Sequence, residues 1–329
     1  MSYSFQLRQF DDEIRRAYLD LLPNQSRAVT AGKLDWKFGN NPHGLGKICV
    51  ARDESGKIVG LNAFMACKMG GSVEPALVGR QSMDTIVAPE ARGKGLFTRM
   101  LEAFYQKSDD SFVYGFPNGN SAPGFFGKLG WTHLGFAPIM VRPLRAKYFA
   151  SKLKLNIPDF SLLVPKKAGI GEKTERFGSW ADEISYGFLS NKPSAITRDH
   201  SYLNWRFVDN PAYQYEILRS ENSFIVRSLQ EKHEGKIGYV LECMGEQREM
   251  VSLLKETVAE MSDRGADALL SWCLPHSPNY RAYRRAGFFP LPPKLRPIEI
   301  HWGVRPLDDR GRLSQQENWY ISYCDSDTV

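Results

Sequence analysis

The sequence lacks the patterns that mark several broad classes of protein. Its cysteines are few, odd in number and without C-x-x-C spacing, which argues against a disulfide framework or a structural zinc site, so we expect no bound metal. No apolar run approaches the roughly 20 residues that a membrane span needs. The N-terminus MSYSFQLRQFDDEIRR carries acidic residues where a secretory signal requires an apolar core. These absences predict a cytoplasmic protein. The five cysteines are Cys49, Cys67, Cys243, Cys273 and Cys324.

The charged residues also lack a strong excess of one sign. The net charge is +6, and the lysines and arginines are dispersed except in RPLRAKYFASKLK, residues 142–154. This run favours a solvated linker helix over a nucleic-acid patch. We therefore expect no nucleic-acid partner.

One unusual phrase occurs twice. LDWKFGNNP spans residues 34–42 and LNWRFVDNP spans 203–211, so Trp36 and Trp205 lie 169 positions apart (205 − 36), roughly one domain length. Farther along, FPNGNSAPGFFGKLGW is matched by LPHSPNYRAYRRAGFF, each a strand end, a polar turn and a short helix. ESGKIVGLNAF and HEGKIGYVLEC also match, as a glycine turn followed by a strand. The repeats predict a duplicated fold, in which the shared aromatics serve packing.

The two copies differ at one turn. Residues 83–107 of the first copy, MDTIVAPEARGKGLFTRMLEAFYQK, predict a strand, a glycine turn and an amphipathic helix. The second copy has LECMGEQREMVSLLKETVAEM, also a strand and a helix, without the Arg-Gly-Lys-Gly turn. Gly93 and Gly95 would let the backbone N–H groups face a pyrophosphate at the helix N-terminus, with Arg92 and Lys94 adding positive charge. A purely structural turn would have the same composition.

VAPEARGKGLF, residues 87–97, resembles the coenzyme A motif of the GNAT superfamily, Q/R-x-x-G-x-G/A after a strand ending in V-x-P. Arg92 and Gly95 match, whereas Phe97 stands where the family usually has Gly or Ala. NGNSAPGFFGKLGW is similar to the superfamily's N-x-x-A-x-x-F-Y-x-x-x-G-F segment. The resemblance implies an α/β protein with two tandem GNAT-like domains, each a mixed, mostly antiparallel twisted sheet flanked by helices.

The implied organisation is a GNAT domain with an acyl-CoA site at 1–145, a linker or insert at 146–190, and a degenerate GNAT-like domain at 191–329 that shapes the acceptor pocket. The co-substrate would be acetyl-CoA or another acyl-CoA. The residues implied to contact it are Ile86, Val87, Arg92, Gly93, Lys94, Gly95, Leu96, Phe97, Asn118 and Phe125.

The catalytic residues are harder to assign. Asp84 lies within an otherwise apolar strand, where a carboxylate needs a polar cleft or partners, so it is a candidate general base. The family's acid is a Tyr in the F-Y pair, but this chain has Phe125-Phe126, so Tyr114 is a substitute candidate or simply a core tyrosine. Glu90 is either a solvated loop residue or a reserve base, and His133 is either a surface residue or a reserve base. Asn118 either positions substrate or caps the next helix.

The C-terminus offers further carboxylates. NWYISYCDSDTV, residues 318–329, predicts a final strand followed by Asp325 and Asp327. These acids are either a solvated tail or a base and a site for a cationic amine. As base candidates we place this pair slightly ahead of Asp84.

The function predicted from these features is acetyl-CoA-dependent acyl transfer to a small amine, possibly an amino sugar or sugar nucleotide of bacterial surface polysaccharide synthesis. One alternative is a Fem-like aminoacyl transferase, which takes its acyl group from charged tRNA. The intact Arg-Gly-Lys-Gly turn favours coenzyme A over tRNA. The other alternative is a non-catalytic acyl-CoA binding protein, which the missing Tyr favours.

Overall fold

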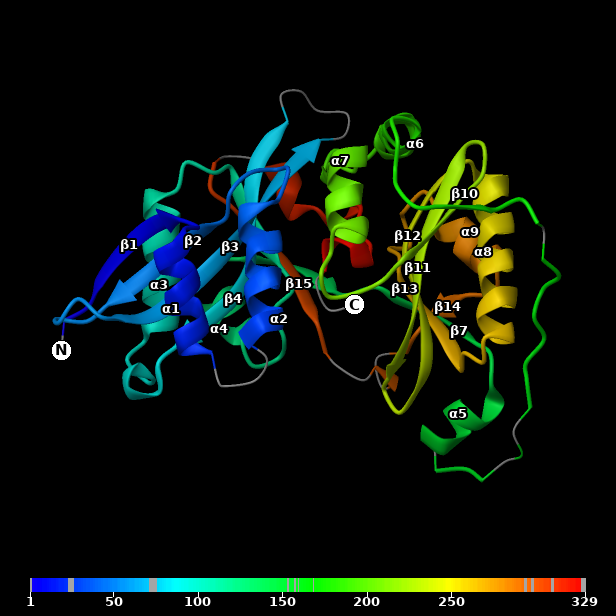
Figure 1. Ribbon diagram of the computed structural model, residues 1–329, viewed down its shortest axis with the longest axis horizontal. Helices are drawn as coiled ribbons and strands as arrows, with labels where there is room; N and C mark the ends of the chain where they lie inside the picture. The colour runs from blue at the N-terminus through cyan, green and yellow to red at the C-terminus, as the bar shows by residue number, and fades with distance from the viewer. Residues whose placement is uncertain are drawn as a thin grey trace. The chain divides into compact units, whose positions relative to one another are not determined.

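The computed structural model describes residues 2–22, 27–70, 76–152, 154–156, 158, 160–167, 169–292, 295–296, 299–308 and 311–326. The chain divides into two compact units (Figure 1). The first unit comprises residues 1–136, 209–212 and 299–318, and the second comprises 137–208, 213–298 and 319–329. Within the described residues no helix is both long and apolar enough to cross a membrane.

The first unit is built on a sheet with strand order β1-β2-β3-β4-β5-β15-β6, in which only β4 and β5 pair in parallel. Helices α1 and α2 lie on one face of this sheet and α3 on the other (Figure 1). Its elements are β1 (Ser4–Gln9), α1 (Asp12–Leu21), α2 (Arg27–Leu34), the π-helix η1 (Asp35–Gly39), β2 (Lys47–Arg52), β3 (Ile58–Gly70), β4 (Leu77–Val87), η2 (Pro89–Ala91), α3 (Leu96–Lys107), β5 (Phe112–Gly115), α4 (Ala122–Gly127), β6 (Thr132–Phe136), β15 (His301–Pro306), η5 (Gly311–Ser314) and η6 (Gln316–Asn318).

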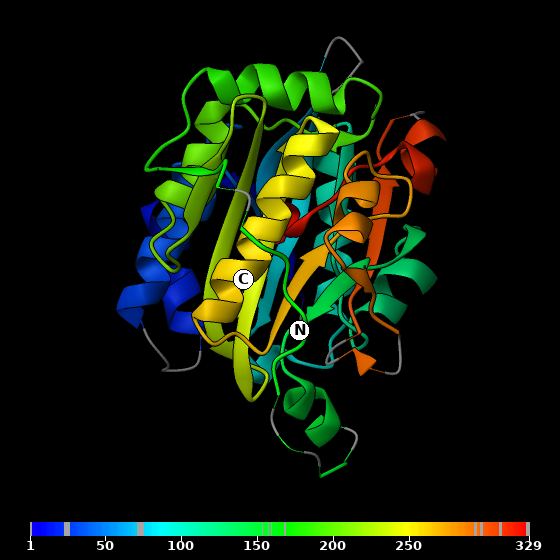
Figure 2. The same cartoon turned by 90° about the vertical axis from the view of Figure 1, so that its right-hand side faces the viewer.

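The second unit repeats this plan, with strand order β8-β10-β11-β12-β13-β7-β14 and one parallel pair, β12 with β13. Helices α8 and α9 lie on one side of the sheet (Figure 2). Its elements are β7 (Ile139–Pro143), α5 (Ala146–Lys152), β8 (Glu172–Thr174), α6 (Trp180–Leu189), β9 (Ala195–Ile196), α7 (His200–Leu203), the π-helix η3 (Asn204–Val208), β10 (Glu216–Arg219), β11 (Ser223–Lys232), β12 (Gly235–Gly245), α8 (Gln247–Asp263), β13 (Ala268–Trp272), α9 (Tyr280–Arg285), β14 (Phe289–Pro290) and η7 (Tyr323–Asp325).

Both units therefore have the mixed, mostly antiparallel α/β architecture that the sequence predicted, which confirms the fold class. One strand of each sheet comes from the other half of the chain. β7 follows β6 in sequence but pairs with β13 and β14 in the second sheet, whereas β15 pairs with β5 and β6 in the first. The two strands occupy equivalent places, so the exchange is reciprocal.

Because of this strand exchange, several elements lie in a different unit from the predicted domain that contains their residues. β7 falls within the predicted first domain, 1–145, yet belongs to the second sheet. β8 and α6 fall within the predicted linker, 146–190, yet they take the places that β1 and α1 have in the first unit. β15 falls within the predicted second domain, 191–329, and completes the first sheet. The units are thus interleaved along the chain.

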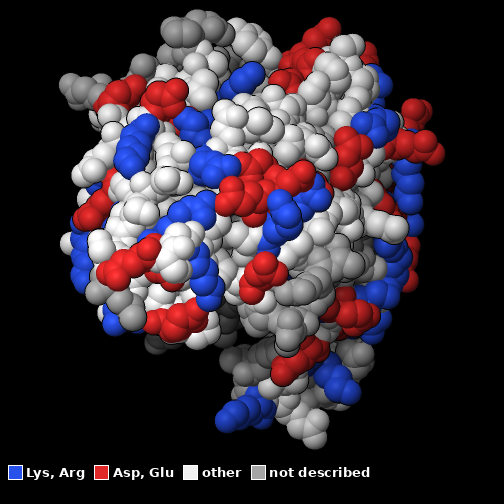
Figure 3. Space-filling view, turned by 60° about the vertical axis from the view of Figure 1, so that its left-hand side comes forward, with Lys and Arg blue, Asp and Glu red and all other residues white. Residues whose placement is uncertain are grey.

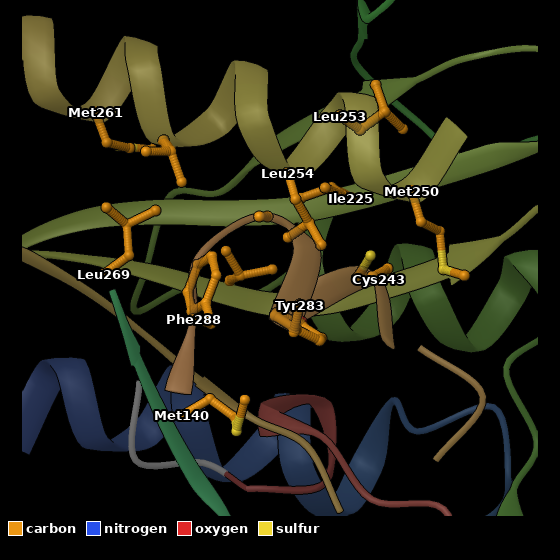
Figure 4. Close-up of a cluster of buried hydrophobic side chains, with 14 of the residues drawn as sticks. Met140, Ile225, Cys243, Met250, Leu253, Leu254, Met261, Leu269, Tyr283 and Phe288 are labelled. Atoms are coloured by element: carbon orange, nitrogen blue, oxygen red, sulfur yellow. The ribbon is translucent and has the colours of Figure 1, made fainter. Parts of the chain in front are cut away.

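The core of the second unit shows how the repeat packs. Leucines and methionines of α8 project onto the sheet and meet Ile225, Cys243 and Leu269 (Figure 4). Met250, Leu253, Leu254 and Met261 are all buried in this cluster. In the first unit α3 packs in the same way, with Leu96, Met100, Leu101 and Phe104 buried as its sequence pattern predicted.

The twin aromatic phrases form π-helices, η1 and η3. Trp36, Phe38, Trp205 and Phe207 are all buried. Their packing role is the same in both copies.

Two sequence interpretations are wrong. The turn at Gly56 joins β2 to β3, whereas the turn at Gly235 joins β11 to β12, so the two turns are not equivalent. The predicted C-terminal strand is absent from the described part of residues 318–326, where η7 and an isolated bridge at Trp319 occur instead. Tyr320 and Ser322 are as buried as Trp319 and Ile321, so the apparent alternation does not reflect one buried face.

Candidate active site

The candidate site is a cleft where β4 and β5 diverge. Their parallel pairing runs from Gly79 to Gln81 on β4 and then stops, although β4 continues to Val87. The cause lies in β4, because Asn62 of β3 faces Thr85 and Phe64 faces Ser82, which leaves an extra residue at Met83–Asp84. Such a β-bulge bends its strand and increases the local twist. The bulge therefore turns the end of β4 away from β5.

The cleft has a volume of about 850 Å³, within the usual range for small-molecule sites. Residues 82–87 of β4 form one wall and residues 115–118 form the other. At its narrow end the strands are close, since a Cβ at Gly115 would lie 3.2 Å from the carbonyl oxygen of Ser82. Trp131 also lines the cleft, and its indole N–H donates a hydrogen bond to the Tyr105 hydroxyl at 2.7 Å.

The glycine turn lies at the wide end, beside the N-terminus of α3. Gly93 and Gly95 have φ values of 73° and 70°, a conformation that strongly favours glycine. No atom lies within 4 Å of a Cβ placed at either position, so the turn borders open space. The first N–H groups of α3 have no partner within the helix and carry its positive dipole end. Arg92 lines the cleft, and Lys94 is exposed.

Phe97, which departs from the family pattern, packs against residues that leave space for its ring. Phe97 meets Phe125 edge to face, with ring centroids 5.3 Å apart. A Cβ at Gly124 would lie 2.8 Å from the Phe97 ring, so the glycine provides the space that the larger side chain takes. Phe97 and Phe125 both line the cleft. Leu96 is buried in the core instead.

Asn118 caps the turn that leads into α4. Its Oδ1 accepts hydrogen bonds from the backbone N–H groups of Asn120 and Ser121 at 3.0 and 3.1 Å. These bonds stabilise the turn before the helix, whereas the N-cap of α4 is Ser121, which has no side-chain cap hydrogen bond. The residue also lines the cleft.

Asp84 lies at the bulge and lines the cleft. The Tyr18 hydroxyl of α1 donates a hydrogen bond to Asp84 Oδ2 at 2.5 Å. Lys37 Nζ of η1 lies 3.8 Å from the same oxygen. The Asp84 side chain is 45% exposed, whereas that of Lys37 is 11% exposed. A largely buried cation is therefore ion-paired with a carboxylate that the cleft can reach.

The other candidates in the first unit have different surroundings. Tyr114 is buried between the rings of Phe112 and Phe116 and does not line the cleft, which matches the core-tyrosine alternative. Glu90 is exposed and ion-paired with Lys57 at 3.1 Å. His133 lies 3.2 Å from His301, and partial burial, with the second imidazole adding, lowers the pKa of His133.

The second unit has a carboxylate at the position equivalent to Asp84. Glu242 lies at the bulge of β12, three residues before the strand ends, as Asp84 does in β4. Glu242 is fully buried and accepts hydrogen bonds from Arg198, Tyr320 and Ser322. Beside it, Asn279 donates to the carbonyl oxygen of Cys243 at 2.8 Å. The equivalent strand edge is therefore occupied by the chain itself.

Asp325 belongs to this buried network rather than to a solvated tail. It is 2% exposed, and it accepts hydrogen bonds from Arg198 Nη2 at 2.7 Å and from the Ser322 backbone at 3.0 Å. Burial alone disfavours the Arg198 cation, but Asp325 and Glu242 outweigh that effect and raise the pKa of Arg198 well above its usual value. Asp327 lies outside the described residues.

Sequence reasoning missed Tyr18 and Lys37. Tyr18 comes from a helix 66 positions before Asp84, and no local pattern links them. Lys37 stands inside the first aromatic phrase, and Arg206 stands at the same place in the second. That shared positive charge was the available signal.

Comparison with known proteins identifies the first unit. The sequence model of the Acetyltransferase (GNAT) domain matches residues 7–134. No curated protein sequence matches the chain.

Solved structures share the fold across most of the chain. A probable N-acyltransferase from Enterococcus faecalis is 11% identical, with a TM-score of 0.60, over 93% of this chain and 73% of that protein. A GCN5-related N-acetyltransferase from Anabaena variabilis is 12% identical, with a TM-score of 0.59, over 93% and 73%.

Saccharomyces cerevisiae N-myristoyltransferase, solved with bound myristoyl-CoA, is 11% identical, with a TM-score of 0.56, over 92% of this chain and 82% of that one. These likenesses confirm the shared architecture. The sequence match identifies residues 7–134 as an acetyltransferase (GNAT) domain, and the rest of the chain shares its fold with these proteins.

Proposed function

We propose that the chain transfers a short acyl group, acetyl foremost, from coenzyme A to a small amine in the cleft of the first unit. The observation that carries this proposal is the divergence of β4 from β5, with the glycine turn at one end of the opening and Asp84 at the other. An elongated cleft with a cationic end and an accessible carboxylate suits a phosphate-bearing thioester and an amine.

The phosphate end is assigned to the turn and to α3. Arg92, Gly93, Lys94 and Gly95 would hold the pyrophosphate with backbone N–H groups and positive charge. Along the wall, Ile86 and Val87 offer main-chain groups on the strand edge that β5 does not pair. Phe97, Asn118 and Phe125 complete the walls. We assign Leu96 a supporting role, because its side chain anchors α3 in the core.

Asp84 is the general base in this proposal. The thioester supplies an activated carbonyl carbon that the amine nitrogen attacks, with cleavage of the C–S bond. Asp84 accepts the proton that the amine loses, directly or through water. Tyr18 and Lys37 contact the carboxylate and orient it. The thiolate takes its proton from solvent, since Phe125 and Phe126 carry none.

The narrow end of the cleft favours a short acyl group. Ser82 and Gly115 approach closely there, and Trp131 is held by Tyr105. For the acceptor, we favour an amino sugar or sugar nucleotide, whose ammonium form the half-exposed Asp84 would attract. We place the reaction in the bacterial cytoplasm, in keeping with five buried cysteines that form no disulfide.

A Fem-like transfer from charged tRNA has less support. In the view that brings the first unit forward, basic and acidic side chains are interspersed (Figure 3). A tRNA-binding surface is expected to carry a continuous basic field.

The test is to incubate the full chain with acetyl-CoA and a panel of amino sugars, amino-sugar nucleotides and polyamines, and to measure released coenzyme A thiol. We expect acceptor-dependent release by the native chain and its loss in Gly95→Val. Gly265→Val is the matched control, because Gly265 has φ 81° and open space around a Cβ but lies in the second unit. Binding of acetyl-CoA without transfer to any amine would favour the non-catalytic alternative.

A further inference from the structure

A segment of the second unit exposes apolar side chains that its core does not use. Between β7 and β8 the side chains of Leu155, Phe160 and Leu163 are 58%, 53% and 93% exposed. Val164 and Ile170 are also exposed. Lone exposed apolar residues are common on protein surfaces, but this many within sixteen positions is a concentrated patch. We call the described residues of 145–170 the basic apolar loop.

Main-chain contacts tie this loop to the second unit. Arg145 pairs with Ser161 in an antiparallel bridge, and the N–H of Ala146 donates to the carbonyl oxygen of Phe160 at 3.2 Å. The N–H of Leu162 donates to the carbonyl oxygen of Leu144 at 2.8 Å. The start of the loop is thus fastened to residues 160–162.

The loop also has an anchor on the sheet. The Tyr148 hydroxyl donates to the carbonyl oxygen of His233, in the turn between β11 and β12, at 3.2 Å. In two views α5 lies beyond the ends of the strands of the second sheet and apart from α8 (Figures 1 and 2). The apolar side chains are therefore held away from the core on an anchored backbone.

The loop is as basic as it is apolar. Residues 145–167 contain six lysines and arginines and a single acidic residue, Asp159. Lys154 precedes Leu155, while Lys166 and Lys167 follow Leu163 and Val164. Lys154 and Lys166 are exposed. Cationic residues thus flank the exposed apolar side chains along one surface segment, which is more than the solvated linker helix that the sequence predicted.

This combination fits one kind of partner. Anionic bilayers attract basic segments through their headgroups and accept neighbouring Leu and Phe side chains at the boundary with the acyl chains. A nucleic acid would use the cations but would give Leu163 and Val164 no apolar contact. A second copy of the loop would be repelled by its like charge.

We propose that the basic apolar loop binds the surface of an anionic phospholipid bilayer. Phe160 and Leu163 enter the interfacial layer, while Lys154 and Lys166 contact the headgroups. This role is separate from the acyl-transfer cleft and does not depend on it.

Vesicle flotation of the full chain tests the proposal. The vesicles are made either of phosphatidylcholine alone or of phosphatidylcholine with phosphatidylglycerol. We expect binding to the anionic vesicles, weaker binding as salt rises, and little binding to phosphatidylcholine alone. Phe160→Ser with Leu163→Ser, and separately Lys154→Glu with Lys166→Glu, should each reduce the bound fraction by at least about tenfold.

Matched controls use exposed residues elsewhere. Tyr186→Ser removes an apolar side chain that is 72% exposed on α6, and Lys68→Glu reverses an exposed charge on β3. Both should bind vesicles as the native chain does, and every variant should keep its circular dichroism. The proposal is overturned if anionic vesicles do not bind, if both vesicle types bind equally, or if the loop variants bind unchanged. Self-association or RNA binding that the loop variants abolish, without vesicle binding, would also overturn it.

Discussion

Tyr18 and Asp84 are joined by a hydrogen bond of 2.5 Å, donated by the tyrosine hydroxyl of α1 to the carboxylate at the bulge of β4. The bond ties a helix on one face of the first sheet to the strand whose divergence opens the cleft. A hydrogen bond to a carboxylate restricts its rotation. The proposed base is thus held in place by a residue outside the cofactor-binding motif.

The first prediction concerns Asp84 itself. Asp84→Asn keeps the shape of the side chain but cannot accept a proton from the amine, so kcat should fall by roughly 10²- to 10⁴-fold. Affinity for coenzyme A should stay the same, because the phosphate end of the cleft is untouched. Steady-state kinetics with calorimetry would measure both. Full turnover in the amide variant would leave Glu90, His133 or water to take the proton.

The second prediction concerns the residues that position Asp84. Tyr18→Phe and Lys37→Met should each lower kcat by roughly tenfold, because each removes a contact that positions the Asp84 carboxylate. Lys37→Arg should restore most of the rate, because it keeps the positive charge. If Lys37→Arg and Lys37→Met were equally impaired with unchanged stability, the charge of Lys37 would not be the cause.

The third prediction concerns the buried cation of the second unit. Arg198→Leu leaves Glu242 and Asp325 buried without their counter-ion and should lower the free energy of unfolding by about 3–5 kcal/mol. Urea unfolding would measure the loss. Lys57→Met, which breaks the exposed pair with Glu90, is the control and should leave stability unchanged within error. Equal effects of the two changes would mean that the buried network is not stabilising.

The fourth prediction follows from the strand exchange. Residues 1–145 produced alone lack β15, which lies between β5 and β6, so two strand edges lose their partners. We expect this fragment to aggregate. Residues 1–136 joined by a flexible linker to 299–318 should be soluble and bind coenzyme A. A soluble fragment 1–145 with the native affinity would contradict the importance of β15.

The fifth prediction concerns the cysteines. All five are buried, and burial raises the pKa of Cys49 and of Cys324 to about 12. A thiol reagent at pH 8 should therefore find no reactive thiolate in the native chain and five thiols after unfolding. Rapid labelling of any thiol before unfolding would show that the fold opens locally.

Much of the fold could be predicted from the sequence because the relevant signals were local. The positive φ of Gly93 and Gly95 and the apolar face of α3 follow from neighbouring residues, and the structure has both. Repetition of the aromatic phrase predicted the second unit. These features depend on local preferences, since glycine is the residue that adopts a positive φ most readily and a helical period places apolar residues on one face.

Contacts between residues far apart in the sequence could not be predicted from local patterns. Nothing in the composition of β7 or β15 specifies which sheet each joins, because strand partners are selected by the whole fold. Asp325 was predicted at the end of a strand, and its burial with Arg198 depends on contacts 127 positions apart. The partners of Asp84 came from α1 and η1 for the same reason.

The most direct test of the central claim is a calorimetric titration of the full chain with coenzyme A. The account predicts one site per chain, because among the described residues the glycine turn and an open strand edge occur together only in the first unit, while Asn279 hydrogen-bonds to the equivalent edge in the second. Gly93→Val with Gly95→Val should abolish this binding, and Gly265→Val should preserve it. Two equivalent sites per chain, or native affinity in the double variant, would contradict the assignment of the cleft.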